Sequence, residues 1–504
     1  MRLLLITGAL VGSLLFPSAS SAEDWVTSRD EVTNQTTQTL TLRISPAAEP
    51  RPALSVRFIP DESQRVDGNS MVHYLKAMGF FEQNATRQKI TEYNIAENER
   101  INNGEIEPEQ RRPYVWLEMR PNEIPLDEAK AYLRWHAWQP SMIREAVLRR
   151  GFSGERNMAT VDSPISYLLP EIQSFREFAR MQSLRCRVAI AEDRVDDAIE
   201  IIGQQFAMAH HLAQDEFFVS ALVGAAIHAM ACNDALYISE HPDAPNMFWA
   251  YAMLPNPVVN MPQAYAWERE ILYAQLKPLK EVSEEVRPAG YWSDVVRRLT
   301  PGLASLEIEG LNFVGRASPD AQQLAVVTAL GSGYSQAKTY LVEEAGMDSG
   351  LVESYPTVQT VLLAACKLYE ELRDEQFKLR RLPYPEVAKR GLFRKLDKRI
   401  GEYNQRYGVS AELATVLLVS LEAIWNAEQR CKMREAMGQA VEAIRLHMHE
   451  NDGAFPGSLD GLSLPPGINP LTGAALDYEN LGGRAVITGD ARFITYRIIL
   501  GKAN

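Results

Sequence analysis

Apolar residues recur at helical spacing through most of the chain. The strongest block runs over residues 171–238, with breaks at residues 192–194 and 214–215. Inside it, Val195, Ala198, Ile202 and Phe206 lie three or four positions apart, which is the stripe that a helix presents to a packed neighbour. The block therefore predicts helical hairpins. Further helices are predicted at residues 264–273, 318–328, 357–379, 391–403 and 411–446.

Two segments near the N-terminus alternate apolar and polar residues with a period of two. They are residues 36–44, rich in Thr and Leu, and residues 53–59, which follow a break containing prolines. This period is typical of half-buried strands, so two short strands are expected. The last of the predicted helices ends near His449.

The first residues have the order of an export signal. Arg2 precedes an apolar stretch that ends at Phe16, and Ser20 and Ala22 occupy the positions that a signal peptidase reads before Glu23. A membrane anchor would need about 20 apolar residues, more than this stretch provides. We therefore expect residues 1–22 to be a signal peptide and the protein to be exported, to the periplasm or beyond.

Composition limits the functions of the exported chain. The full sequence has 504 residues and a net charge of −13, and removal of Arg2 with the signal brings the charge to −14. An acidic protein is a poor general binder of nucleic-acid phosphates, so no nucleic-acid partner is predicted. The longest other apolar stretches, residues 221–232 and 414–420, are shorter than a bilayer span. No transmembrane segment is therefore predicted in the mature chain.

Part of the hairpin block is similar to a known repeat. The run Arg194-Val195-Asp196-Asp197-Ala198 at the start of the second helix resembles a tetratricopeptide-like helix-turn-helix. The likeness covers one repeat length, and no second copy follows at the expected period of about 34 residues. The resemblance implies a helix-pair geometry and no peptide-binding groove.

The C-terminal region resembles the globular part of type II secretion pseudopilins. After the long helix the motifs come in this order: Gly453-Ala454-Phe455-Pro456, Ser458-Leu459, Asn469-Pro470-Leu471-Thr472-Gly473 and Leu476-Asp477-Tyr478. The resemblance covers about the last 60 to 90 residues and implies a long helix followed by a short sheet. The calcium-binding loop of that family is unmatched, because residues 489–492 lack the required run of oxygen ligands.

The combination of parts is also similar to a group of uncharacterised exported bacterial proteins. The shared features are a lead-in such as residues 44–54 and the helix-pair block near Ala198. This resemblance implies an exported, mainly helical architecture and no established activity.

The predicted fold class is mainly α. We expect an irregular helical-hairpin array or bundle, with a short N-terminal β lead-in and a small C-terminal α+β module. The predicted divisions are a signal peptide (1–22), a β-containing lead-in (23–65), a helical domain (66–410) and a long helix with the pseudopilin-like module (411–504).

The chain has four cysteines, all in helical contexts: Cys186, Cys232, Cys366 and Cys431. The favoured interpretation is that they are small buried hydrophobic residues. The best alternative is a disulfide between Cys366 and Cys431 in an oxidising compartment. No Cys-x-x-Cys occurs, so a dithiol or a Cys-rich zinc site is not predicted.

Several short patterns suggest chemistry but have simpler explanations. Ser335 and Lys338 have the Ser-x-x-Lys spacing of penicillin-binding enzymes, without the companion motifs. His228, in an apolar run, is predicted to be a hydrogen-bonded core histidine. Other groups of candidate ligands or acids are His210-His211; His447, His449, Glu450 and Asp452; Glu268 and Glu270; and Glu281, Glu284 and Glu285. Their spacing favours helix ends and solvated faces over a metal centre or a pair of catalytic carboxylates.

One segment departs from the acidic character of the chain. Basic residues cluster between Lys378 and Arg399, and Leu392, Phe393, Leu396 and Ile400 form an apolar stripe among them. Such a stripe is typical of a surface helix that packs inward. The alternatives are contact with anionic lipid through residues 378–400, or docking of an acidic partner.

No catalytic, cofactor-binding or metal-binding residue is assigned. His-Glu-x-x-His, Gly-x-Ser-x-Gly and Walker-type motifs are absent from the sequence. We therefore expect an exported binding or scaffold protein of the cell envelope with an unknown protein partner. The alternatives are an envelope hydrolase with a scattered active site and a minor secretion-system component.

Overall fold

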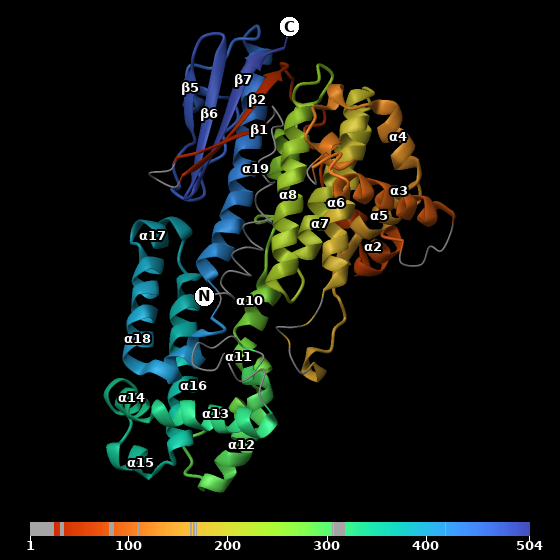
Figure 1. Cartoon of the computed structure of the whole chain (residues 1–504). Helices are drawn as coiled ribbons and strands as arrows, with labels where there is room; N and C mark the ends of the chain where they lie inside the picture. The colour runs from red at the N-terminus through yellow and green to blue at the C-terminus, as the bar shows by residue number, and fades with distance from the viewer. Residues whose placement is uncertain are drawn as a thin grey trace. The chain divides into compact units, whose positions relative to one another are not determined.

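The computed structural model describes residues 25–30, 35–79, 85–107, 110–161, 164, 167, 169–304, 306, 318–418 and 420–503. The predicted signal peptide lies outside these residues. The chain is mainly α-helical, as predicted, with strands near both ends (Figure 1). It divides into two compact units. Within the described residues, the helical unit comprises 156–167 and 265–423, and the sheet unit comprises 25–155, 169–264 and 424–503.

Both ends of the chain contribute strands to one sheet. The strands are β1 (Trp25–Arg29), β2 (Thr36–Ile44), β5 (Asp477–Asn480), β6 (Arg484–Ala491) and β7 (Ile494–Lys502). Their order is β1-β2-β7-β6-β5; β2 and β7 run parallel, and the other neighbours are antiparallel. Leu40, Leu42 and Ile44 point to the core face of β2 and are fully buried. The predicted lead-in strand and the predicted C-terminal sheet are therefore parts of the same structure.

The second strand predicted for the lead-in, residues 53–59, is not formed, and that prediction is wrong. These residues make turns and bends. Prolines flank the segment and cannot donate to a strand ladder. Phe58 is instead buried against the rings of Phe206 and Tyr251, with centroids 5.1 Å apart in both pairs. This apolar side chain of the segment thus packs against helices and not within a sheet.

A long helix, α19 (Leu421–Glu450), lies along the sheet (Figure 1). The guanidinium of Arg434 is 4.6 Å from the ring centroid of Tyr496 on β7. A Cβ at Gly489 on β6 would come within 2.6 Å of the sulfur of Met433. Glycine at position 489 therefore permits the close approach of strand and helix.

The predicted hairpins are present as α6 (Pro170–Ala191), α7 (Val195–Leu212) and α8 (Phe218–Ile238). The breaks between them fall at residues 192–194 and 213–217, where the sequence predicted them. A Cβ at Gly224 on α8 would come within 2.8 Å of the backbone oxygen of Ala209 on α7. The two helices thus approach more closely than a larger residue at position 224 would allow.

Buried ion pairs join elements of the sheet unit. Arg187 on α6 and Asp234 on α8 are 3.4 Å apart, and both are buried. Glu442 and Arg445 on α19 are 2.9 Å apart, with side chains 1% and 0% exposed. Arg445 also donates to the backbone oxygen of Ser45 at 2.9 Å and to the loop after α8 at 2.8 Å. Arg445 therefore connects α19 to the chain that follows β2.

The remaining elements of the sheet unit surround these helices. A short parallel pair is formed by β3 (Val66–Asn69) and β4 (Arg149–Gly151). The helices are α2 (Met71–Ala77), α3 (Ala85–Asn102), α4 (Leu126–Arg134), α5 (Gln139–Val147) and α9 (Phe248–Ala252), with α10 (Pro262–Glu268) at the boundary of the unit. Single 3-10 turns are η1 (Glu62–Gln64), η3 (Tyr114–Leu117), η4 (Pro121–Glu123) and η11 (Leu459–Gly461).

The helical unit is built around α16 (Thr357–Leu379), which has the predicted bounds. Its core includes Trp292, Tyr340, Tyr369 and Tyr407, each no more than 2% exposed. The other elements are η5 (Met158–Thr160), α11 (Ile271–Gln275), η7 (Lys277–Glu281), α12 (Ala289–Ala304), α13 (Pro319–Ser332), α14 (Tyr334–Thr339), the π-helix η10 (Tyr340–Glu344), α15 (Ser349–Ser354), α17 (Tyr384–Lys389) and α18 (Leu392–Thr415).

Helices α16 and α18 lie side by side as a hairpin (Figure 1). The chain kinks within α18 at Gly408, whose φ of +47° lies in the left-handed region. The bounds predicted for the last two helices, 391–403 and 411–446, are therefore wrong. The break predicted between them is a kink, and the true interruption follows Thr415, before α19 begins at Leu421.

Candidate functional site

A groove of about 500 Å³ opens on the helical unit between the end of α16 and the start of α18. Its apolar lining consists of Leu379, Leu382, Leu392 and Leu396. Leu379 and Leu396 are buried, whereas Leu382 is 45% exposed. Leu382 therefore makes part of this otherwise buried apolar lining accessible. We call this feature the leucine groove.

The local sequence explains why the groove forms at this point. Helix α16 ends at Leu379, and Pro383 begins the short turn that leads into α17. Gly391, with a φ of +59°, takes the left-handed conformation immediately before α18. The chain therefore reverses over residues 380–391, which include α17, and leucines from both helices line the same groove.

Basic side chains surround the leucine groove, and some are neutralised. The Nζ of Lys378 is 2.6 Å from Glu375, and Arg399 forms ion pairs with Glu371 and Glu375. Farther along the hairpin, the ion pairs are Arg390 with Glu386 at 3.0 Å and Lys398 with Glu402 at 3.4 Å.

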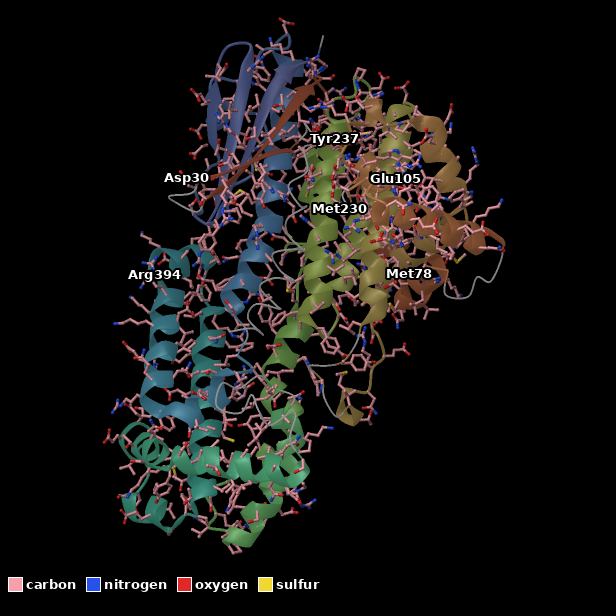
Figure 2. All side chains as sticks on the ribbon, in the orientation of Figure 1. Asp30, Met78, Glu105, Met230, Tyr237 and Arg394 are labelled. Atoms are coloured by element: carbon pink, nitrogen blue, oxygen red, sulfur yellow. The ribbon has the colours of Figure 1, made fainter. Side chains whose placement is uncertain are left out.

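Other cations of the segment 378–399, of which Lys395 lines the groove, have no such partner among the described residues. Within the described part of the chain, no carboxylate pairs with Arg381, Lys389, Arg394 or Lys395. Arg394 and Lys395 belong to the first turn of α18, where Figure 2 labels Arg394. Residues 378–399 contain nine basic and two acidic residues, a net charge of +7 in a chain of −13. The groove therefore carries a local positive field.

A network of hydrogen bonds fixes one side of the rim. Glu371 accepts hydrogen bonds from the phenols of Tyr340 at 2.9 Å and Tyr403 at 3.1 Å, as well as pairing with Arg399. The guanidinium of Arg399 also lies 5.0 Å from the centroid of the Tyr403 ring. Burial raises the pKa of Tyr403, so this phenol remains a donor at neutral pH. Arg399 is thus held at the edge of the groove.

The structure does not combine Ser335 and Lys338 into a reactive pair. Ser335 is exposed on α14. The Nζ of Lys338 is 2.7 Å from Glu353 on α15, which keeps the ammonium charged and directed away from the serine. This arrangement agrees with solvent-facing helix residues.

Two of the four candidate metal ligands at the end of α19 are engaged in other interactions. At the end of α19, His447 lies 3.3 Å from the side-chain nitrogen of Asn451, and Glu450 accepts a hydrogen bond from Ser463 at 3.2 Å. Across the described ranges, no group of three or more His, Cys, Asp or Glu side chains is placed to hold a metal ion.

The adjacent histidines His210 and His211 have separate partners. The Nδ1 of His210 is 2.9 Å from the backbone oxygen of Val258. His211 lies between the phenol of Tyr74 and the backbone oxygen of Arg149, at 2.9 Å from each. Burial lowers the pKa of His211 to about 3, so its imidazole is neutral and structural.

His228 is a hydrogen-bonded core histidine, as predicted. Its ring is fully buried, and its Nε2 lies 2.7 Å from the carboxylate of Glu435 on α19. The ring also packs edge-on against Phe206, with centroids 5.3 Å apart. Full burial leaves no route for a substrate to this imidazole.

All four cysteines are free and buried, which confirms the favoured interpretation. The alternative disulfide between Cys366 and Cys431 is not formed. Burial raises the pKa of Cys366 to about 12, so its thiol is protonated at neutral pH. A protonated, inaccessible thiol is a poor nucleophile.

The acidic groups also lack the arrangement of a catalytic pair. Glu281, Glu284 and Glu285 contact Arg298 at 2.7 Å, Lys367 at 2.6 Å and Arg287 at 2.6 Å, respectively.

The other acidic pair is divided between different environments. Glu270 is exposed, whereas burial raises the pKa of Glu268 to about 8. Glycoside hydrolysis requires two carboxylates that flank one cleft, and neither Glu268 nor Glu270 lines the leucine groove.

A second cavity, of about 680 Å³, lies in the sheet unit near the ends of β2, α6 and α8. Most of its polar lining is engaged within the chain. Arg120 pairs with Glu240 at 3.2 Å, the Nε2 of His241 lies 2.9 Å from Asp193, and the backbone N–H of Arg43 donates to Glu240 at 2.7 Å.

Comparisons with protein-family models, with curated proteins and with solved structures find no match. Helix α8 has the length and apolar composition to cross a membrane, and 72% of its most apolar window is buried inside the structure. The core helix of a packed unit meets the same criteria.

The sequence analysis identified the cluster of basic residues between Lys378 and Arg399 and its apolar stripe, but it did not predict the groove. Phe393 and Leu396 are buried, as expected for an inward-packing stripe, whereas Leu392 lies at the groove surface. The contribution of Leu379 and Leu382 was not predicted. The available signal was two leucines three positions apart, beside Lys378, at the point where a predicted helix meets a proline-rich joint.

Proposed function

We propose that this chain is an exported binding or scaffold protein of the cell envelope, and that the leucine groove is its docking surface. The partner is a protein whose contact segment carries carboxylates beside apolar side chains. The observation that carries the proposal is the combination of an accessible apolar lining with Lys395, a lining cation for which the described residues offer no ion pair.

The charge pattern supports a protein partner with acidic character. A cluster of +7 within a chain of −13 attracts acidic segments locally. Nucleic acid is disfavoured, because the remainder of the chain repels a long polyanion that extends beyond the cluster. The apolar lining adds burial, which supplies affinity that charge alone does not.

A photo-crosslinking experiment tests the docking surface. A photoreactive amino acid replaces Leu382 in the groove or, as a control, Leu324 on α13, which is 68% exposed and does not line the groove. After irradiation of cells that export the chain, we expect a discrete adduct from position 382. The adduct should be lost when Lys395→Glu is added, whereas position 324 should give none. Equal adducts at both positions, or none at either, would contradict the proposal.

Export is tested separately by the mature N-terminus. Mass spectrometry of the protein from the envelope fraction should find Glu23 as the first residue, two positions before β1 begins. Intact Met1 on cytosolic protein would count against export.

A further inference from the structure

The spacing of the groove leucines matches that of a helix-packing surface. Leu392 and Leu396 are four positions apart on α18, and Leu379 and Leu382 are three apart at the end of α16 and in the turn after it. Rows of side chains with these spacings form the ridges between which a third helix packs. A helix docked in this way places apolar residues at positions i, i+3 or i+4, and i+7 against the groove.

The distribution of charge around the groove indicates which residue types should flank the apolar stripe of such a helix. Of the charged side chains that line the groove, Lys378 and Arg399 pair with Glu375, which lines it as well, whereas Lys395 has no ion pair within the described residues. Arg381 and Arg394 extend the positive surface beyond it, and neither has an ion pair within the described segments. Carboxylates on both sides of an apolar stripe would meet these cations as the leucines are covered.

Two other anionic occupants fit less well. The carboxylate of a fatty acid would neutralise one cation and leave the others unpaired. A membrane surface is broad, whereas this lining is recessed between two helices, and membrane-bound amphipathic helices insert a projecting apolar face. A helical ridge with several carboxylates satisfies both the concave shape and the spread of charge.

We infer that the partner presents an acidic amphipathic α-helix, which docks lengthwise in the leucine groove. This inference rests on the proposed function and adds the chemistry of the partner segment. Its apolar stripe covers Leu382 and Leu392, and its Asp or Glu residues pair with Lys395 and the neighbouring cations.

A designed peptide tests the inference directly. The probe is a fluorescein-labelled peptide of about 16 residues, long enough to sample helix in water, with leucines at heptad-like spacing and glutamates on both flanks. Binding to the full mature chain is followed by fluorescence anisotropy. One control peptide has the same composition with the leucines out of register, and a second has lysine in place of each glutamate. We expect binding by the first peptide alone, with affinity that falls as salt rises.

Variants of the protein locate the site. Lys395→Glu and Leu382→Ser should each weaken binding by about fivefold or more, because one reverses a rim charge and the other removes an apolar contact. The matched controls are Lys280→Glu on η7 and Leu324→Ser on α13, both exposed and outside the groove lining. Each control should change the affinity by less than about twofold. Circular dichroism establishes that all four variants remain folded.

Vesicles containing anionic phospholipid and free oleate serve as competing probes. Binding of either one that is lost in Lys395→Glu and Leu382→Ser, without binding of the peptide, would overturn the inference. Failure of the peptide to bind, while the photo-crosslink at position 382 persists, would also overturn it and leave the docking surface standing. Loss of both the crosslink and peptide binding would contradict the proposed function itself.

Discussion

Arg445 shows how one buried cation organises distant parts of the sheet unit. Its guanidinium pairs with Glu442 on the same helix and donates to backbone oxygens after β2 and after α8. A buried charge that loses its partner costs far more than an exposed pair contributes.

Replacement of Arg445 by alanine should therefore be severe. Arg445→Ala leaves the carboxylate of Glu442 buried without its counter-ion, and we expect the free energy of unfolding to fall by about 3–5 kcal/mol. The control is Arg144→Ala, which breaks the exposed pair with Glu200 (60% and 44% exposed) and should cost less than about 1 kcal/mol. Urea unfolding followed by circular dichroism measures both. Similar losses in the two variants would show that burial does not determine the effect.

His211 makes stability depend on pH. Burial lowers its pKa in the folded chain to about 3, against about 6.5 in an unfolded chain. Between these values the unfolded state takes up a proton that the folded state excludes. Stability is thus fully present above pH 6.5 and falls as the pH drops toward 3, by about 1.4 kcal/mol per pH unit from this group.

The variant His211→Gln isolates this contribution. As the pH falls from 7 to 4, the free energy of unfolding should decline less steeply in the variant than in the parent chain. The two slopes should differ by about 1.4 kcal/mol per pH unit, the value for one proton. The variant is also expected to be less stable at pH 7, because the contacts with Tyr74 and Arg149 change. Parallel pH profiles would mean that the histidine does not carry the effect.

At the scale of elements, alanine substitutions at two glycines of α18 are expected to have opposite effects on stability. Gly408 has a φ of +47°, and a Cβ there would come within 2.5 Å of Gln336. Gly401 lies in the regular part of the same helix, with open space around its Cβ position. We expect Gly408→Ala to destabilise the chain by about 1–3 kcal/mol and Gly401→Ala to stabilise it by about 0.5–1 kcal/mol. Thermal unfolding compares the two; a shift of the same sign in both would argue against strain at the kink.

Helices whose ends carry local signals were predicted well. Pro356 before α16, and the polar break at residues 192–194 between α6 and α7, mark boundaries that the structure reproduces. The interruption after Thr415 was missed because residues 411–420 contain neither glycine nor proline and continue the apolar pattern. The segment at 53–59 was misassigned because alternating apolar residues indicate only that one side of a segment is buried. They do not indicate whether a strand or a helix covers that side.

The candidate site could be only partly predicted. The cations at 378–399 are visible in the sequence, but their pairing depends on which carboxylates the fold brings near. Glu371 reaches Arg399 across the hairpin, whereas no carboxylate of the residues that the structure describes pairs with Lys395. The apolar lining likewise combines Leu382 and Leu396, whose proximity follows from the reversal of the chain over residues 380–391.

At the scale of the whole molecule, the parallel pairing of β2 with β7 joins residues 36–44 to residues 494–502. Local alternation predicted the strand at residues 36–44, and the resemblance to pseudopilins implied a sheet near the C-terminus. Neither held information on the pairing of the two, because pairing over such a separation depends on the tertiary fold. The N-terminal lead-in is consequently not an independent segment. Its stability depends on the last strand of the chain.

Truncation after residue 410 should therefore disturb more than the C-terminal module. Loss of β7 removes the ladder partner of β2 and uncovers Leu40, Leu42 and Ile44, so we expect aggregation and rapid proteolysis within residues 25–44. Deletion of residues 23–29 removes only β1, whose side chains from Val26 to Arg29 are exposed, and should leave a soluble, protease-resistant protein. Limited proteolysis with mass spectrometry distinguishes the two chains. Protection of residues 36–44 in the chain ending at residue 410 would show that the lead-in folds without the C-terminal strands, since no other strand in the described ranges could replace β7 beside β2.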